Sequence, residues 1–213
     1  YRKNYQYGID YSAYINQAGC VVSGETCYPR ISSVQGPCFY PAGHLYFFVP
    51  AYLVHTYTEH AEFIVKIVFA MFHSANIYLA SSIAFRYFKN EPRRAQFVVL
   101  LLLANEYDRQ FHQLMYNDQI MACCLLATIY FVAESMPTAA MIMFNLGLSI
   151  KIGVFLLLPS LLGQLQYRYG VGMLLKFALS LYVIQKVLCI PFMICPDEYF
   201  TSSRIFGHAE WYA

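Results

Sequence analysis

Long apolar runs with few charges are the feature that most limits the folds open to this chain. Hydrophobic residues make up 59% of its 213 positions and charged residues only 12%. In an average soluble domain about a quarter of the residues are charged, so water is not the main solvent of this protein. We therefore expect an all-α, polytopic membrane protein, built as a bundle of transmembrane and short broken helices.

The apolar runs differ in length, and a full membrane span takes about 20 residues. Phe63 to Phe88 and Gly170 to Cys195 are long enough, and we predict a transmembrane helix over each. The first of these runs ends in the basic residues Lys89, Arg93 and Arg94, which indicate the cytosolic side. Apolar runs that fall short of a full span on their own cover residues 45–57, 95–104 and 119–133.

The run from Thr138 to Gln166 is apolar throughout but carries Lys151 near its middle. As one span, it would place Arg168 on the lumenal side. If it is split near Lys151, its arms of about 13 residues would each rise roughly 20 Å, less than the hydrocarbon thickness of about 30 Å. We favour the split, which gives a broken half-depth hairpin and returns Arg168 to the cytosolic side. Broken helices inside membranes normally line a cavity.

The chain divides into an opening segment, an apolar body and a closing segment. Residues 1–42 are rich in Gly, Pro, Ser and Cys, and we expect a loop-rich lumenal segment with one short helix over Tyr11 to Gln17. Residues 43–195 form the predicted transmembrane helical domain, and 196–213 a truncated lumenal loop. Without an initiator Met or a signal peptide, the chain is expected to be a fragment. The net charge of +2 forms no clustered basic stripe, which argues against a nucleic-acid surface.

The seven cysteines fall into a group in the opening segment and a group within or beside apolar runs. If the opening segment is lumenal, a disulfide is expected among Cys20, Cys27 and Cys38, or from one of them to Cys195. The alternative is that these thiols stay free and pack as small hydrophobic groups. No paired CxxC spacing with histidine partners occurs, so we expect no metal site.

Three polar positions stand out against the apolar background. Lys151 lies far from both ends of its run, where an ammonium is costly unless it meets an anion, a carboxylate or water. Asp10 and Asp118 either cap the helices that follow them or act at a site. Together they suggest an anion inside the membrane and a carboxylate near its lumenal face, and a lipid-linked phosphate is the simplest such anion.

Five strings resemble, in order, the dolichyl-phosphate-mannose alpha-1,3-mannosyltransferases of N-glycan assembly. They are IDYSAY at 9–14, GPCFYPAGHLY at 36–46, LMYND at 114–118, LSIKIGVFLLLPSLL at 148–162 and IPF at 190–192. The YPAGH and Ser-Ile-Lys blocks are the most specific of them. The chain departs from the family, which usually has Glu, Trp, Asp and Asn where this sequence has Gly8, Tyr11, Val34 and Gly153.

The resemblance implies a GT-C type glycosyltransferase, a multi-pass protein of the endoplasmic reticulum membrane. Such an enzyme transfers mannose from dolichyl phosphate mannose to a lipid-linked oligosaccharide by an inverting single displacement, without a cofactor. Asp10 would be the base, and Lys151, helped by Arg204, would stabilise the departing phosphate. The residues expected to orient the sugars are Tyr40, His44, Asn117 and Asp118.

Two other functions remain open at this point. One is a transporter or channel with a midplane anion site at Lys151, although no internal repeat is visible. The other is an inactive relative, which the missing acids at Gly8 and Val34 leave open.

Overall fold

The computed structural model describes residues 8–89, 91–105 and 113–195, and this part of the chain is almost entirely helical. A short antiparallel hairpin, β1 (Ser32–Ser33) and β2 (Gly36–Pro37), is the exception. The α-helices are α1 (Ile9–Val22), α2 (Ala42–Tyr57), α3 (Ala61–Tyr87), α4 (Pro92–Leu103), α6 (Asp118–Ala133), α7 (Pro137–Ile150), α8 (Leu158–Tyr169) and α9 (Val171–Cys189). Short 3-10 helices are η1 (Tyr28–Arg30), η2 (Ile152–Leu157) and η3 (Ile190–Phe192).

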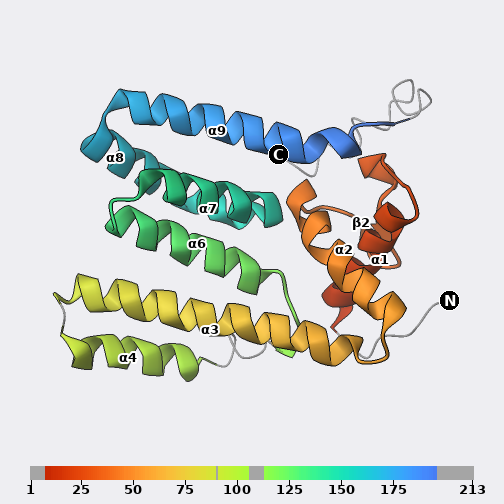
Figure 1. Ribbon diagram of the computed structural model, residues 1–213, viewed down its shortest axis with the longest axis horizontal. Coiled ribbons are helices and arrows are strands. Elements are labelled where there is room, and N and C mark those ends of the chain that lie inside the picture. Colours follow the sequence, from red (N-terminus) through yellow and green to blue (C-terminus); the bar gives the residue numbers. More distant parts are fainter. Residues whose placement is uncertain (1–7, 90, 106–112, 196–213) are drawn as a thin grey trace.

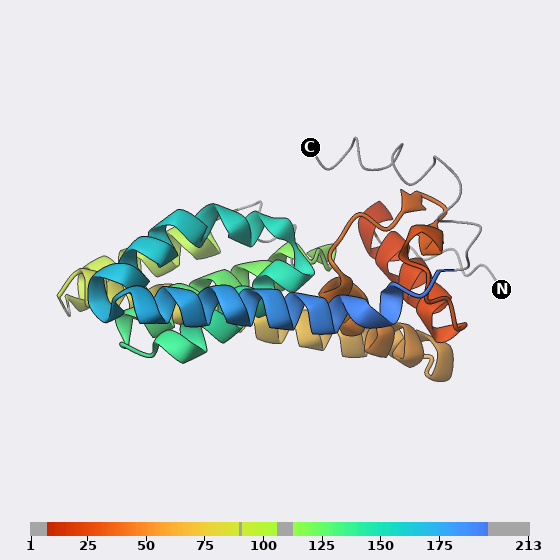
Figure 2. The same ribbon diagram turned by 90° about the horizontal axis from the view of Figure 1, so that it is seen from above.

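The helices form a bundle with a separate cap at one end. α3, α4, α6, α7, α8 and α9 run side by side along the long axis, whereas α1, α2 and the hairpin gather at one end (Figure 1). Seen from above, the same cap covers the same end of the bundle (Figure 2). The α3–α4, α6–α7 and α8–α9 connections all lie at the opposite end. The described part of the chain therefore has two structurally different ends, a cap end and a connection end.

Two helical stretches of the described residues are long and apolar enough to cross a membrane: Ala61–Tyr87 and Val171–Phe192. They correspond to the two spans expected from the sequence. In their most apolar windows only 17% and 6% of the residues are buried inside the protein. Large apolar side chains such as those of Met71, Leu175 and Leu179 face outward, at 63–67% exposure. Helices that present apolar side chains outward need an apolar solvent, so the fold is that of an all-α membrane protein.

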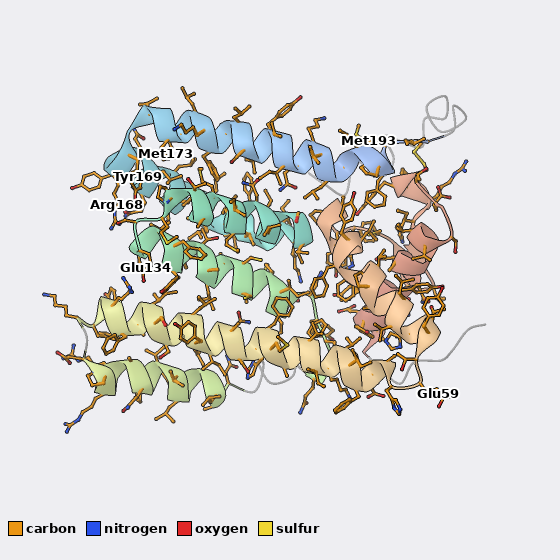
Figure 3. All side chains as sticks on the ribbon, viewed as in Figure 1. Glu59, Glu134, Arg168, Tyr169, Met173 and Met193 are labelled. Carbon is orange, nitrogen blue, oxygen red and sulfur yellow. A yellow bond between two sulfur atoms is a disulfide. The ribbon has the colours of Figure 1, made fainter. Side chains whose placement is uncertain are left out.

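The break predicted at Lys151 is confirmed. α7 ends at Ile150, Lys151 has extended backbone angles (φ −154°, ψ 134°), and the chain continues as η2 and then α8. Arg168 and Glu134 both lie at the connection end (Figure 3). The Arg168 guanidinium donates to the carbonyl oxygen of Val132 at 3.1 Å. The two arms therefore run out and back, as expected for a broken hairpin.

α1 is longer than the helix expected over Tyr11 to Gln17, because tertiary packing stabilises it. One face of α1 buries Tyr11, Tyr14, Ile15 and Ala18, each at most 1% exposed. That face joins a core that also contains side chains of α2, α3, α6, α7 and the turn before α6: Phe48, Val65, Phe69, Met115, Ile120 and Ile150. Most helical stability in proteins comes from such packing rather than from local propensity. The opening segment is thus part of the fold rather than a loop outside it.

A disulfide joins Cys27 in the opening segment to Cys195 beyond α9. This is one of the pairings left open by the sequence. Beside it, the Thr26 hydroxyl donates to the Ile194 carbonyl oxygen at 3.2 Å, and Cys27 pairs with Met193 in an isolated β-bridge. The other cysteines of the described residues are free thiols. The disulfide fixes the cap to the end of α9.

Candidate functional site

The ammonium of Lys151 has a partner inside the protein. Its Nζ lies 2.8 Å from both carboxylate oxygens of Asp118, in the first turn of α6. The two side chains are 30% and 26% exposed, so the pair is shielded but still reachable. An intramembrane Lys was expected to meet an anion, a carboxylate or water. The partner is a carboxylate of the same chain, and Lys151 by itself does not require a lipid phosphate.

Asn117 connects this ion pair to the cap. Its side-chain oxygen Oδ1 accepts from Lys151 Nζ and from the Tyr14 hydroxyl, each at 3.4 Å. Its Nδ2 donates to Nδ1 of His44 at 3.3 Å. Asn117 is fully buried, and a buried amide is retained only where its polar atoms find partners. One amide thus joins α1, α2, α6 and the break after α7.

His44 lies in the first turn of α2 and is also fully buried. Tyr40 stacks on its ring at 4.5 Å with an interplanar angle of 23°, and the Tyr14 and Phe48 rings lie 4.6 Å away. Burial and the nearby charge of Lys151 lower the pKa of His44 to about 3, which keeps the imidazole neutral. Its Nε2 has no hydrogen-bond partner among the described residues.

Gly43 explains why His44 can lie so near the break in α7. A Cβ at position 43 would come within 2.2 Å of the Ser149 hydroxyl and 2.7 Å of the Ser149 carbonyl oxygen. Only a residue without a side chain lets the start of α2 touch the last turn of α7. The Pro-Ala-Gly-His string therefore brings His44 and Lys151 to one place.

Asp10 is exposed in the first turn of α1, where its negative charge interacts favourably with the positive end of the helix dipole. It does not cap the helix, because Gly8 occupies the N-cap position. Tyr14 follows one turn later. Burial, a hydrogen bond with Tyr40 and the charges of Asp10 and Asp118 together raise the pKa of the Tyr14 phenol. Asp10 and Tyr14 are four residues apart in α1, so Asp10 lies one helical turn from a phenol that belongs to the polar cluster.

Tyr40 connects the polar cluster to an apolar groove. Lys151 Nζ lies 5.9 Å from the centre of the Tyr40 ring, within range of a cation–π interaction. The ring also lines a cavity of about 860 Å³ between the cap, the break after α7 and the end of α9. The cavity walls include Tyr28, Leu148, Ile152, Leu181 and Phe192. A long apolar molecule with a polar end would fit this arrangement, with its polar end at Tyr40 and Lys151.

The structure brings most of the sequence-predicted residues together. Tyr40, His44, Asn117, Asp118 and Lys151 form one continuous set of contacts. Arg204 lies outside the described residues. Within the described part of the chain, no group of His, Cys, Asp or Glu side chains could hold a metal ion.

Tyr14 is the site residue that sequence reasoning missed. Its hydroxyl contacts Asn117 and the Tyr40 hydroxyl. The available signal was its spacing from Asp10, since residues four apart lie on the same face of a helix. A Tyr one turn after a candidate base could therefore have been included.

The family profile and several similar curated proteins all point to the same family. The profile of the ALG3 protein family matches residues 3–211. The Dol-P-Man:Man(5)GlcNAc(2)-PP-Dol alpha-1,3-mannosyltransferase of Cryptococcus neoformans is 29% identical over 95% of this chain and 49% of its own length. The corresponding human protein is 26% identical over 93% of this chain and 45% of its own. The Drosophila melanogaster protein Alg3 is 28% identical over 95% of this chain and 40% of its own.

The chain spans less than half the length of these curated relatives, from 40% to 49%. No solved structure matches it significantly. The family match nevertheless includes all five strings on which the resemblance was based, and the resemblance is confirmed. The chain belongs to the ALG3 protein family.

Proposed function

We propose that this chain carries the donor site of a mannosyltransferase of the endoplasmic reticulum membrane. The reaction is transfer of mannose from dolichyl phosphate mannose to a lipid-linked oligosaccharide during N-glycan precursor assembly. The observation that carries the proposal is the meeting, at Tyr40, of an apolar groove with the polar cluster that contains Lys151. Asp10 lies one turn of α1 before Tyr14, whose hydroxyl belongs to that cluster. The names of the curated relatives, which specify this donor and acceptor, support it.

The groove suits the prenyl chain of the donor. Its walls are mostly aliphatic and aromatic, so burial of a hydrocarbon chain there is favourable. The phosphate would then lie beside Tyr40 and the exposed side of Lys151. Lys151 Nζ donates to three oxygens, both of the Asp118 carboxylate and Oδ1 of Asn117, yet its side chain stays 30% exposed, so a phosphate can approach it. Arg204 is proposed as a second cation for the same phosphate.

Asp10 is proposed as the general base. The acceptor hydroxyl oxygen forms a bond to the anomeric carbon as the bond from that carbon to the phosphate oxygen breaks. The electron pair leaves with the phosphate, and the hydroxyl proton passes to the Asp10 carboxylate. One displacement inverts the anomeric centre. Asp10 is exposed, so an acceptor sugar can reach it.

Asp118 is the acid that pairs with Lys151. We propose that its carboxylate also accepts a hydrogen bond from a hydroxyl group of the mannose. His44 and Asn117 are buried and therefore cannot contact a sugar directly. We propose that they orient the sugars through the residues they contact, Tyr40 and Lys151.

The proposed orientation is multi-pass, with the cap in the lumen. The disulfide at the cap end is typical of an oxidising compartment. The end of α3, the start of α4 and Arg168 lie at the opposite end, where Lys89, Arg93 and Arg94 add positive charge (Figures 1 and 3). Positive residues favour the cytosolic side.

A transport function is less well supported, because the charge of Lys151 is already paired with Asp118. The remaining alternative is that this chain is an inactive relative of the enzymes, and an activity measurement decides between the two.

The test is mannose transfer by the chain in lipid nanodiscs, with dolichyl phosphate mannose as donor and a lipid-linked oligosaccharide as acceptor. Asp10→Asn should abolish transfer and leave thermal unfolding unchanged. Glu59→Gln is the matched control, because Glu59 is an exposed acid at the same end (Figure 3). Unchanged turnover in Asp10→Asn would remove Asp10 from the mechanism, and no transfer by the parent chain would reject the proposal that this chain by itself catalyses the reaction.

A further inference from the structure

We infer that His44 is a positioning residue that, through Asn117, fixes the direction in which Lys151 presents its ammonium. The inference rests on the proposed function in one respect only, namely that Lys151 acts on the phosphate of the donor.

The contacts of Asn117 determine how its amide is oriented. The atom that faces Lys151 must be the oxygen, because an ammonium only donates hydrogen bonds. The same oxygen accepts a hydrogen bond from the Tyr14 hydroxyl. The amide nitrogen then faces Nδ1 of His44 at 3.3 Å and must donate to it. Nδ1 is therefore an acceptor, and the imidazole carries its proton on Nε2.

The surroundings of His44 hold this arrangement rigidly. The rings of Tyr14, Tyr40 and Phe48 contact the imidazole, and Gly43 packs against the last turn of α7. His44 and Asn117 are both fully buried, so neither contacts a substrate. Any effect of His44 on the reaction must therefore pass through a neighbouring residue, either Asn117 or the Tyr40 ring that lines the groove. An Asn117→Ala background separates these two routes.

The consequence concerns Lys151. With Nδ1 as acceptor, the amide is locked and its oxygen draws the ammonium toward Asn117 and Tyr40. Without that acceptor, the amide is free to turn, and the Asp118 carboxylate alone sets the position of Lys151. A displaced ammonium would bind the donor phosphate less well and leave the acceptor sugar unaffected.

A matched pair of variants isolates the acceptor atom. In His44→Asn, the new Oδ1 stands where Nδ1 was, because both atoms are bonded to Cγ. His44→Leu has a similar apolar volume and no acceptor. We expect His44→Leu to lower kcat/KM for dolichyl phosphate mannose by about tenfold without changing the KM of the acceptor, a loss of about 1.4 kcal/mol. His44→Asn should stay within about twofold of the parent chain, because one neutral hydrogen bond is retained.

A double-mutant cycle gives the second readout. In an Asn117→Ala background, His44→Leu should cause no further loss in kcat/KM for the donor. Equal losses in His44→Leu and His44→Asn, or a full additional loss in the Asn117→Ala background, would overturn the inference.

A third readout is taken on the unmodified chain, and a variant serves only to assign the His44 signals. Nitrogen NMR of the imidazoles, with His44 assigned by its absence in His44→Asn, should show Nδ1 without a proton and Nε2 with one. The opposite tautomer would overturn the inference. Lys151→Ala distinguishes the two levels: if it leaves kcat/KM for the donor unchanged, the proposed role of Lys151 fails. If it lowers that value while His44→Leu does not, only the positioning role of His44 fails.

Discussion

Asp118 holds Lys151 with both carboxylate oxygens, each 2.8 Å from the ammonium, across the point where α7 is broken. The two residues are 33 positions apart and belong to different helices. An ammonium within an apolar run is costly without such a partner. The pair therefore stabilises the break and sets the charge at the polar end of the groove.

Asp118→Asn should destabilise the fold, because it leaves the Lys151 charge without a carboxylate. The pair is partly exposed, so we expect about 1–2 kcal/mol, less than the 3–5 kcal/mol typical of a fully buried pair. Chemical denaturation in detergent measures the loss. In the control Glu62→Gln, the exposed pair with Lys66 in α3 is removed, which should cost less than about 0.5 kcal/mol. Equal losses would show that the Lys151–Asp118 pair has no special role.

Gly43→Ala should separate α2 from the end of α7. The added methyl group would overlap the Ser149 hydroxyl and the Ser149 carbonyl oxygen, and such overpacking typically costs about 1–3 kcal/mol. Gly163→Ala is the matched control, because a Cβ there meets nothing within 4 Å and Gly163 lies inside α8. Ala at that position should raise stability by about 0.5–1 kcal/mol. Thermal unfolding of the two variants should therefore shift in opposite directions, and a common direction would contradict the close approach of α2 and α7.

The spans, the break at Lys151 and the pairing of Lys151 with Asp118 differ in how far the sequence predicts them. The spans over α3 and α9 and the break at Lys151 could be predicted because run length and a single charge are local signals. The pairing of Lys151 with Asp118 could not, because no local pattern specifies which residues 33 positions apart come into contact.

The candidate site was predictable to a similar extent. Tyr40 and His44 could be chosen because strings of this chain resemble a known family, and Lys151 because it is a charge inside an apolar run. That His44 and Asn117 are fully buried could not be read from the sequence, since their burial depends on how α1 packs across α2 and α6. The length of α1 was missed for the same reason, because its inner face is stabilised by tertiary contacts.

Loss of the Cys27–Cys195 disulfide should loosen the groove as well as the fold. Tyr28 and Phe192 both line the groove, pack edge to face with 6.2 Å between ring centres, and lie next to the bridged cysteines. Cys27→Ser, Cys195→Ser and the double variant should each lose about 2–4 kcal/mol of stability. The three losses should be equal, because each variant breaks the same bond. Their KM for the donor should rise. Cys20→Ser is the control, since a hydroxyl can replace the thiol that donates to Ser32. Additive losses in the double variant would argue against this disulfide.

Stability should depend on pH through His44. Its pKa in the folded chain, about 3, is below the usual 6.5, so between these values the unfolded chain binds the extra proton. Stability therefore rises with pH in that window, is fully present above about 6.5 and is lost as pH falls. The groups that face the ring are Lys151 and the Tyr14 and Tyr40 phenols, and Lys151 is in turn paired with Asp118.

The measurement is thermal unfolding of the parent chain and of His44→Asn between pH 7 and 5. The parent should lose stability more steeply than the variant, which has no group at position 44 to protonate. Parallel curves would mean that His44 is not held neutral.

The central claim is that Lys151 stabilises the phosphate of a lipid-linked sugar donor, and separate kinetics for the two substrates of Lys151→Ala test it most directly. Transfer is measured in nanodiscs, with each substrate varied while the other is saturating. We predict that kcat/KM for dolichyl phosphate mannose falls at least about tenfold while the KM of the oligosaccharide acceptor stays unchanged. Equal weakening for both substrates would contradict the claim and assign Lys151 a packing role.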